Sequence, residues 1–372
     1  MPDIIPWEPH SQRGAAGFIL PATLAAIVIL GLAAAYFAGR VDELREGARQ
    51  LQQWSESERE AFSVHQALMY QASIVPASVH GIAVDGVALR PDGRAYRLSD
   101  NHVLRVQDER GLLPILAMEP AVLRRLLTHL EVPAERFERL SDTLQDFIDW
   151  DDLRRLNGAE AREYAEAGLP PPPNDFLRSR DDLRMVLGWR ELIADLDRRG
   201  GDLGERFLTQ FTAARHGGIN INAAPPLVLA ALPGFDAAKI SALIDQRTLK
   251  PFETLGELAP FTNGRLDEEL VWLVGANTWR ATHAKEGLPF LLECQIVFTP
   301  AAKDRPAFVR ECRRRPRSLF APVEIGEFSR TPRADQNISK ALTTSTGSRQ
   351  RATPVSPVPI EWLARAAGLG PR

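Results

Sequence analysis

The first forty residues contain the longest apolar segment of the chain. Between Arg13 and Arg40 there are 26 consecutive residues without a charged side chain, from Gly14 to Gly39. A membrane-spanning helix needs about 20 apolar residues, so this segment is long enough to cross a bilayer once. A secretory signal peptide is the competing interpretation, but its apolar core is usually about 7–15 residues long. No clear small-x-small cleavage site precedes the polar stretch that follows.

A helical pattern continues past the apolar segment. Apolar side chains recur every three or four residues from Val41 to Ala72, and no strong helix breaker lies between Arg40 and Ser73. The pattern predicts one helix that runs from the membrane into the aqueous phase. A single-pass anchor followed by a separate helix is the alternative. Residues 82–107 then consist of short β-branched runs split by Asp-Gly turns, which predicts strands.

Residues 108–280 are helical in pattern and contain an internal repeat. The stretch that begins at Gly111 resembles the stretch that begins at Gly217, and each contains a proline that can start a helix. A second helical stretch follows in each case, over residues 133–148 and 236–247. The repeat predicts two degenerate helix-turn-helix units packed together in a small α-helical domain.

The rest of the chain predicts a hairpin and a polar tail. Residues 288–299 and 306–313 have the pattern of two strands around a turn. Residues 327–359 are rich in Ser, Thr, Arg and Pro and have few large apolar side chains, which predicts disorder. Residues 360–367 have the pattern of a short terminal helix.

Composition and charge exclude several classes of protein. The chain has 372 residues, a formal net charge of −3 and a mean hydropathy of −0.19. These values disfavour a multi-span membrane protein and a chain-wide nucleic-acid footprint, which would be basic. The sequence has no nucleophile elbow, HExxH motif, Walker A loop or dinucleotide fingerprint. The seven histidines have no metal-ligand spacing, so no enzymatic activity is predicted.

The second helical unit resembles a helix-hairpin-helix module, which raises an alternative function. That function is a membrane-anchored periplasmic DNA-binding receptor. In such modules the hairpin typically reads Gly-hydrophobic-Gly, and its backbone amides approach a phosphate. Here the triplet is Gly234-Phe235-Asp236, and a carboxylate at its third position repels phosphate. Residues 216–280 carry five basic and seven acidic side chains, a net charge of −2. We therefore expect a structural use of the hairpin and no nucleic-acid partner.

The densest acidic cluster lies between the two helical units. Asp146, Asp149, Asp151 and Asp152 are followed by Asn157-Gly158-Ala159-Glu160. Carboxylates alternating with Asn and Gly suit a hard cation that takes six to eight oxygen ligands, although the spacing is not that of an EF-hand. The alternatives are a solvated acidic turn, or a helix end paired with the basic residues Arg154, Arg155 and Arg162.

The two cysteines, Cys294 and Cys312, lie at equal distances from residue 303, in the predicted turn between the last two strands. In a hairpin that turns there, the two side chains face each other. A periplasmic location permits a disulfide, and the spacing across two strands is compatible with one. Two buried free thiols are the other interpretation.

The residues before the apolar segment resemble the leader of type IV prepilins and pseudopilins. In those proteins a dedicated peptidase cuts after a glycine and methylates the new terminal residue. The predicted cut lies between Gly17 and Phe18, and the second choice lies between Gly14 and Ala15. The fifth mature position is then Ala22, where the family pattern has a glutamate that neutralises the terminal amine of a neighbouring subunit. Among pseudopilins, the lack of this glutamate is characteristic of the K-type minor subunit.

Further along, the chain resembles the K-type minor pseudopilin of the type II secretion system, the general secretion pathway protein K family. The resemblance rests on the leader, on Val106–Leu113, on the acidic cluster with residues 157–160, and on Ile219–Pro225. It implies an α+β, pilin-like fold with a long N-terminal helix and an antiparallel sheet. A large α-helical domain with helix-hairpin-helix-like repeats is inserted into this fold. The implied divisions are a leader at 1–17, a membrane half-helix at 18–39, the rest of the helix and first strands at 40–107, the inserted domain at 108–275, closing strands at 276–326 and a disordered tail at 327–372.

The resemblance also implies a function and a location. K-type subunits lie at the tip of a short periplasmic pseudopilus, over the I- and J-type minor subunits, and the major pseudopilin forms the rest of it. They take part in pseudopilus assembly and in export of folded proteins across the outer membrane. The chain is expected to be cut by prepilin peptidase and to cross the inner membrane once, with its bulk in the periplasm. Family members bind calcium in or beside the α-domain, and Asp149, Asp151 and Glu160 are the predicted ligands.

Overall fold

A computed structural model describes residues 19–369, except residues 76–77, 85, 265, 303 and 321–356. The two predicted leader cuts, at Gly17–Phe18 and Gly14–Ala15, lie outside the described residues. The chain divides into two compact units, Met1–Glu58 and Arg59–Arg372. The second unit contains all the described strands and all the helices that follow the first one.

Helix α1 runs without interruption from Ile19 to Ile74. The prediction of one continuous helix is therefore confirmed, and the alternative of two separate helices is wrong. By length and composition, α1 is the one helix among the described residues that is able to cross a membrane. Its apolar side chains between Leu20 and Phe37 are exposed in this protein chain, as expected of a segment that contacts lipid or other helices.

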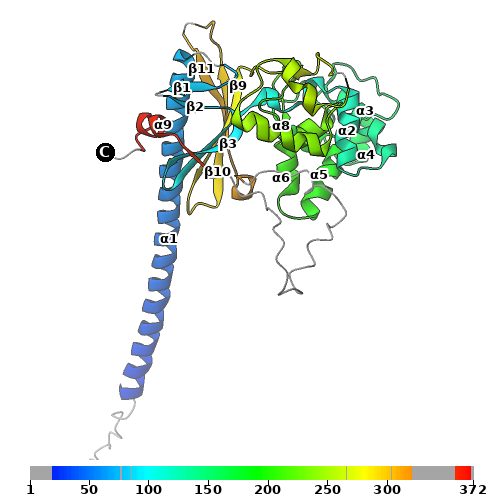
Figure 1. Cartoon of the computed structure of the whole chain (residues 1–372). Helices are drawn as coiled ribbons and strands as arrows, with labels where there is room; N and C mark the ends of the chain where they lie inside the picture. Colours follow the sequence, from blue (N-terminus) through cyan, green and yellow to red (C-terminus); the bar gives the residue numbers. More distant parts are fainter. Residues whose placement is uncertain are drawn as a thin grey trace, which may run out of the picture. The chain divides into compact units, whose positions relative to one another are not determined.

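Six strands of the second unit form one sheet in the order β11-β10-β9-β4-β3-β12 (Figure 1). Five of them pair antiparallel with their neighbours, and the short β12 joins the edge strand β3 in parallel. Their bounds are β3 (Asp92–Ser99), β4 (His102–Asp108), β9 (Thr278–Lys285), β10 (Phe290–Phe298), β11 (Ala307–Pro316) and β12 (Val358–Pro359). The hairpin predicted over residues 288–313 is β10–β11.

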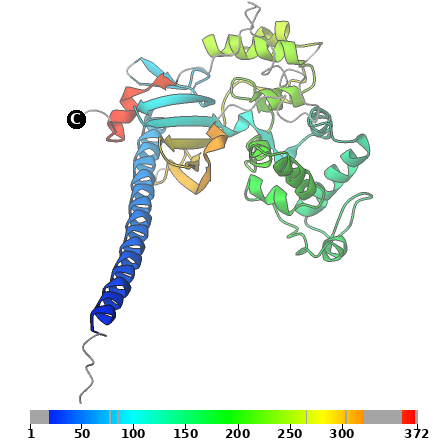
Figure 2. The ribbon, with the colours of Figure 1, turned by 90° about the horizontal axis from the view of Figure 1, so that it is seen from below.

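A large helical segment is inserted between the adjacent central strands β4 and β9. Figures 1 and 2 show its helices gathered to one side of the sheet. This arrangement confirms the predicted α+β fold with an inserted helical region. Its elements are η1 (Glu109–Gly111), β5 (Leu113–Pro114), η2 (Ile115–Ala117), α2 (Pro120–His129), η3 (Ala134–Arg136), α3 (Phe137–Ile148), α4 (Ala161–Glu166), η4 (Arg180–Met185), α5 (Trp189–Arg198), α6 (Leu203–Leu208), β6 (Phe211–Thr212), β7 (Ile219–Asn220), α7 (Pro226–Ala231), α8 (Ala237–Leu249), η5 (Leu255–Phe261) and β8 (Val271–Trp272).

The internal repeat appears in the fold as two helical pairs, α2–α3 and α7–α8. Pro120 and Pro226 each occupy the first turn of a helix, where the missing N–H costs nothing. The first helices of the two pairs pack on each other. At their contact, His129 Nε2 lies 3.0 Å from the Ala230 carbonyl oxygen, and Arg125 Nη2 donates to the Phe235 carbonyl at 3.1 Å. Two packed helical pairs are what the repeat predicted.

The sheet has a different neighbour on each face. Successive residues of a strand point to opposite faces, and β10 shows this clearly. Cys294 and Ile296 are fully buried on one side, where Ile296 joins a core with Val64 and Leu68 of α1. The intervening Glu293 and Gln295 point to the other side, toward the inserted domain. A hairpin of β1 (Ile82–Val84) and β2 (Val87–Leu89) completes the α1-side core.

The end of the chain departs from the expectation for it. The domain division placed a disordered tail over residues 327–372, which is wrong for residues 357–369, whereas the short helix predicted over residues 360–367 is confirmed. β12 pairs with β3, and α9 (Glu361–Ala366) follows in the place of the predicted short helix. Ile360, Trp362 and Leu363 are buried in the α1-side core. Residues 321–356, which include most of the predicted tail, lie outside the described residues.

Candidate functional site

The predicted cation site lies where helix α3 ends. Asp146 is fully buried there, and Arg155 Nη1 donates to its Oδ1 at 2.7 Å. The same guanidinium group pairs with Asp149 Oδ2. The turn after Arg155 presses against Asp146, because a Cβ at Gly158 would lie 1.8 Å from Asp146 Oδ2. One arginine therefore holds two carboxylates at the end of α3, as in the helix-end alternative drawn from the sequence.

Glu160 faces this same cluster from the start of α4. It is 5% exposed, and neither of its carboxylate oxygens has a hydrogen-bond partner in the described part of the chain. Burial and then the charges of Asp146 and Asp149 raise the pKa of Glu160 to about 7. Asp149 Oδ1 is also buried without a partner among the described residues. These unpartnered oxygens are donors of the type that a hard cation takes.

Asp151 does not share this environment. It is exposed, and its Oδ1 accepts a hydrogen bond from the Leu153 backbone N–H at 2.8 Å. The three predicted ligands are thus split, with Asp149 and Glu160 in the cluster and Asp151 at the surface. Asp146 belongs to the cluster but was not among the predicted ligands. Its spacing from Leu140, Thr143 and Phe147, which are buried on the same helix, marks it as an inward-facing carboxylate.

The carboxylates of Asp146, Asp149 and Glu160 are suitable ligands for calcium, but they do not form a closed site in this structure. Among the described residues, the one group of three ligand atoms mutually within 4.8 Å lies elsewhere, at His65, Cys294 and Cys312. A cation among Asp146, Asp149 and Glu160 therefore requires the Arg155 side chain to move aside.

The junction between the inserted domain and the sheet is a second polar centre, and it is buried. Arg180 Nη2 of η4 donates to Glu293 Oε1 of β10 at 2.7 Å, and Arg315 Nε of β11 donates to the same oxygen at 3.2 Å. Burial alone would raise the pKa of Glu293, but Arg180, Arg280 and Arg315 lower it to about 2. Glu293 is therefore ionised at neutral pH and ties the helical domain to the sheet.

A second buried carboxylate extends this junction. Glu109, which directly follows β4, accepts hydrogen bonds from Thr212 Oγ1 and Gln295 Nε2, each at 2.7 Å. Arg280 Nη2 of β9 lies 3.3 Å from Glu109 Oε1. Both of its oxygens are thus paired with groups from the sheet and from the inserted domain. Together with Glu293 and its arginines, these bonds form a buried polar network that fixes one relative position of the two parts.

Asp108 joins the two strands between which the insertion leaves and returns. Its Oδ2 accepts from Asn220 Nδ2 at 2.7 Å, and its Oδ1 accepts from the Ala276 backbone N–H at 2.9 Å. Asn222 Nδ2 in turn donates to the carbonyls of Phe252 and Leu273. From the sequence, the Ile219–Pro225 motif indicated only a family resemblance. The structure gives its two asparagines a position at the root of the insertion.

The hairpin triplet Gly234-Phe235-Asp236 is engaged within the chain. Asp236 Oδ1 caps α8 by accepting from the Lys239 backbone N–H at 2.9 Å, and Asp236 Oδ2 accepts from Asn263 Nδ2 at 2.6 Å. The Asn263 N–H donates to the Gly234 carbonyl, also at 2.6 Å. The turn that contains Asn263 thus lies against the hairpin, so the arrangement gives no support to a phosphate contact there.

Comparison with known proteins points to one family. Residues 105–197 match the family model described as protein K of the type II secretion system. Among solved structures, the chain is similar to a chain of the GspK-GspI-GspJ complex from the type 2 secretion system of enterotoxigenic Escherichia coli, with a TM-score of 0.52 and 21% identity. The similarity covers 72% of this chain and 98% of that chain. A search of the curated proteins found no match. The resemblance to the K-type family that the sequence showed is thereby confirmed.

Proposed function

We propose that this chain, whose residues 105–197 match protein K of the type II secretion system, is the minor pseudopilin at the tip of the pseudopilus. It would take part there in assembly of the pseudopilus and in export of folded proteins. The observation that carries the proposal is the helical domain inserted between β4 and β9 of a pilin-like sheet. The family match falls on the first part of that insertion.

The geometry suits a subunit with no neighbour ahead of it. Glu109 and Glu293 hold the inserted domain to one face of the sheet, so the domain is a fixed obstacle rather than a swinging appendage. A subunit added beyond it would meet this bulk. Ala22 lies on the exposed apolar part of α1 and has no carboxylate for the terminal amine of a following subunit. Both features support the position at the tip.

The proposed partners are the I- and J-type minor pseudopilins, with the major pseudopilin below them. The similar Escherichia coli chain was solved in a complex of these K, I and J types. In the second unit of this chain, α1 exposes the large apolar side chains of Phe62, Tyr70 and Ile74. Large exposed apolar side chains along one helix are candidates for contacts with other helices. These residues would contribute to the contact with the partner helices.

Membrane location and processing complete the proposal. The N-terminal part of α1 would hold the chain in the inner membrane with its bulk in the periplasm. Prepilin peptidase would cut after Gly17 and methylate Phe18. Calcium would bind at the end of α3, held by Asp146, Asp149 and Glu160, with Asp151 on the solvent side. When bound, the ion supplies positive charge among these carboxylates, and Arg155 would be released from them.

A deletion in the chain's own host tests the proposed function. We expect loss of this subunit to lower export of type II substrates and to leave them folded in the periplasm, and a plasmid copy to restore export. Unimpaired export without the subunit would contradict the proposal. Tight binding of DNA at low salt by the purified full chain would instead favour the receptor function.

A further inference from the structure

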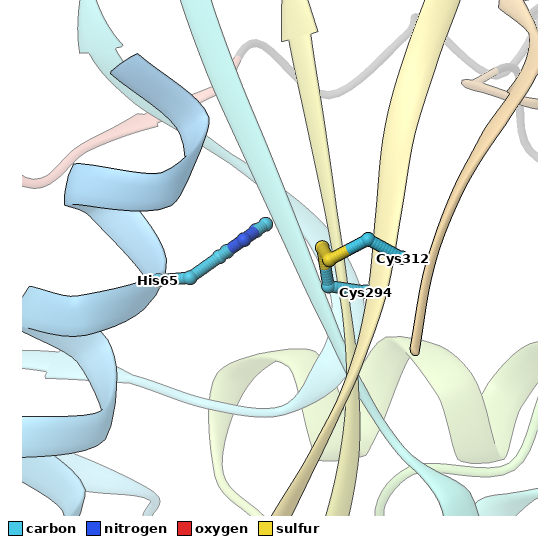
Figure 3. A group of neighbouring side chains, drawn as sticks. All are labelled: His65, Cys294 and Cys312. Atoms are coloured by element: carbon cyan, nitrogen blue, oxygen red, sulfur yellow. A yellow bond between two sulfur atoms is a disulfide. The ribbon is translucent and has the colours of Figure 1, made fainter. Parts of the chain in front are cut away.

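Three ligand-type side chains lie together beneath the closing hairpin. A ring nitrogen of His65 and the Sγ atoms of Cys294 and Cys312 all lie within 4.8 Å of one another. Figure 3 shows the His65 ring extending from α1 toward the two sulfur atoms. In this structure the sulfurs form a disulfide between β10 and β11. The packing of α1 on the sheet therefore adds an imidazole to a pair of cysteines that the sequence had linked only with each other.

The position of each group follows from the fold. Cys294 and Cys312 are paired residues of β10 and β11, with Cα atoms 4.1 Å apart. Cys294 is fully buried on the sheet face that α1 covers, and His65 is 1% exposed on that helix. Cys312 lies on the edge strand and is exposed. The group is thus closed on the α1 side and reachable from solvent on the β11 side.

Among the described residues, the polar ring of His65 has an unsatisfied nitrogen. Its Nε2 atom is buried without a hydrogen-bond partner among the described residues, an arrangement that costs free energy. An imidazole that is not protonated has one ring nitrogen with a lone pair to donate. A leucine would fill this space without an unpaired nitrogen. A buried imidazole with an unpaired nitrogen, next to two sulfur atoms, is the observation that points to a ligand.

We propose that in the dithiol state of the chain His65, Cys294 and Cys312 bind one Zn²⁺ ion. Two thiolates and one neutral imidazole are a known zinc donor set, with a water molecule in the fourth position. The exposed side of Cys312 is where that water would reach the ion. Two thiolate charges cancel the charge of Zn²⁺, so the filled site is neutral, which suits a buried position. Calcium and magnesium prefer oxygen ligands and do not suit these donors.

The zinc site and the disulfide are alternative states of the same cysteines. A phosphine and one water molecule reduce the disulfide to two thiols, and the phosphine leaves as its oxide. Zn²⁺ then displaces one proton from each thiol, and His65 donates its free nitrogen lone pair. In either state a covalent or coordinate link joins β10 to β11, and the zinc state also links this hairpin to α1. A chain whose disulfide has not yet formed would thus have a metal-held form of the same hairpin.

The experiment uses the full chain in detergent, reduced with a phosphine under anaerobic conditions. Co²⁺ serves as the spectroscopic probe, because thiolate ligation and four-coordinate geometry give characteristic absorption bands. We expect one Co²⁺ per reduced chain, displaced by one equivalent of Zn²⁺, and no such bands for the disulfide form. His65→Leu should weaken zinc binding by at least about tenfold, since loss of even an outer-shell partner of a zinc ligand typically costs about 10–100-fold. His80→Leu, at an exposed histidine, is the matched control and should bind like the wild type.

Equal zinc affinity of the wild type and His65→Leu would overturn the proposal, as would the absence of thiolate-to-cobalt bands in the reduced chain. If His65→Leu does not fold, X-ray absorption of the zinc-loaded wild type decides. The proposal requires two sulfur atoms at about 2.3 Å and a nitrogen at about 2.0–2.1 Å from zinc. A shell without sulfur, or one of sulfur alone, would overturn it.

Discussion

Replacing Glu293 with glutamine removes the charge at the centre of the domain junction and keeps the size of the side chain. Glu293 Oε1 accepts hydrogen bonds from Arg180 and Arg315, whose side chains are only 4% and 8% exposed. The variant therefore leaves two buried guanidinium groups with less negative charge between them. Breaking a buried ion pair by removing one partner typically costs about 3–5 kcal/mol.

The pKa of Glu293 gives a second route to the same magnitude. Its value falls from 4.5 to about 2 in the folded chain. At about 1.36 kcal/mol per unit, this shift corresponds to roughly 3 kcal/mol of stability. Because the folded pKa is depressed, this stability is fully present above pH 4.5 and is lost as the pH falls toward 2. The glutamine variant has no carboxyl group there and so lacks this part of the pH dependence.

Chemical denaturation of the full chain in detergent, followed by tryptophan fluorescence, measures the effect. We expect Glu293→Gln to lower the free energy of unfolding by about 3 kcal/mol at pH 7 and by much less at pH 2 to 3. The matched control is Glu311→Gln, because Glu311 pairs with Arg313 on the exposed edge strand. An exposed pair typically contributes about 0–1 kcal/mol. If Glu293→Gln were as stable as the wild type at pH 7, the junction would not be the fixed contact described above.

Three further variants or conditions test other parts of the structure. Gly158→Ala should destabilise the chain by about 1–3 kcal/mol through overpacking, because the added Cβ would lie 1.8 Å from the buried Asp146 carboxylate. The control Gly256→Ala, whose Cβ would have its nearest atom at 3.9 Å, should change little, and equal melting temperatures for the two variants would contradict this packing. Because Trp362 is buried in the core, Trp362→Ala should lower the free energy of unfolding by about 3–5 kcal/mol, and Glu361→Ala, at an exposed residue of the same helix, is its control. A Trp362→Ala variant as stable as the wild type would mean that α9 does not stabilise the core. Calcium at about 100 times its Kd should stabilise the chain by about 2.7 kcal/mol. Glu160→Gln should abolish this stabilisation, whereas Asp151→Asn should keep most of it. A melting temperature that a chelator leaves unchanged would contradict calcium binding.

The sequence predicted well those features that depend on local patterns. The continuous α1 follows from an unbroken helical period, and β10 and β11 follow from alternating apolar runs around a turn. The two helical pairs follow from a repeat that includes Pro120 and Pro226. Each of these depends on neighbours close in the chain, which is the range in which propensity and periodicity act.

Contacts between distant residues escaped prediction. Glu109 and Arg280 are 171 positions apart, and Arg180 and Glu293 are 113 apart, so neither pairing has a local sequence signal. The same reason applies to α9: the sequence predicted a short helix there, but it gave no local signal that Trp362 packs in a core built by α1 and the sheet. At the acidic cluster, the alternation of carboxylates drew attention to Asp151. The helical period of α3 would have favoured the buried Asp146 instead.

Assembly with the partner subunits tests the central claim most directly. The full chain is co-expressed with the I- and J-type minor pseudopilins of the same secretion system, extracted in detergent and captured through a tag on the I-type subunit. We predict that this chain and the J-type subunit are both recovered, in equal amounts with the I-type subunit. Recovery of the I- and J-type pair without this chain would contradict its assignment to the tip.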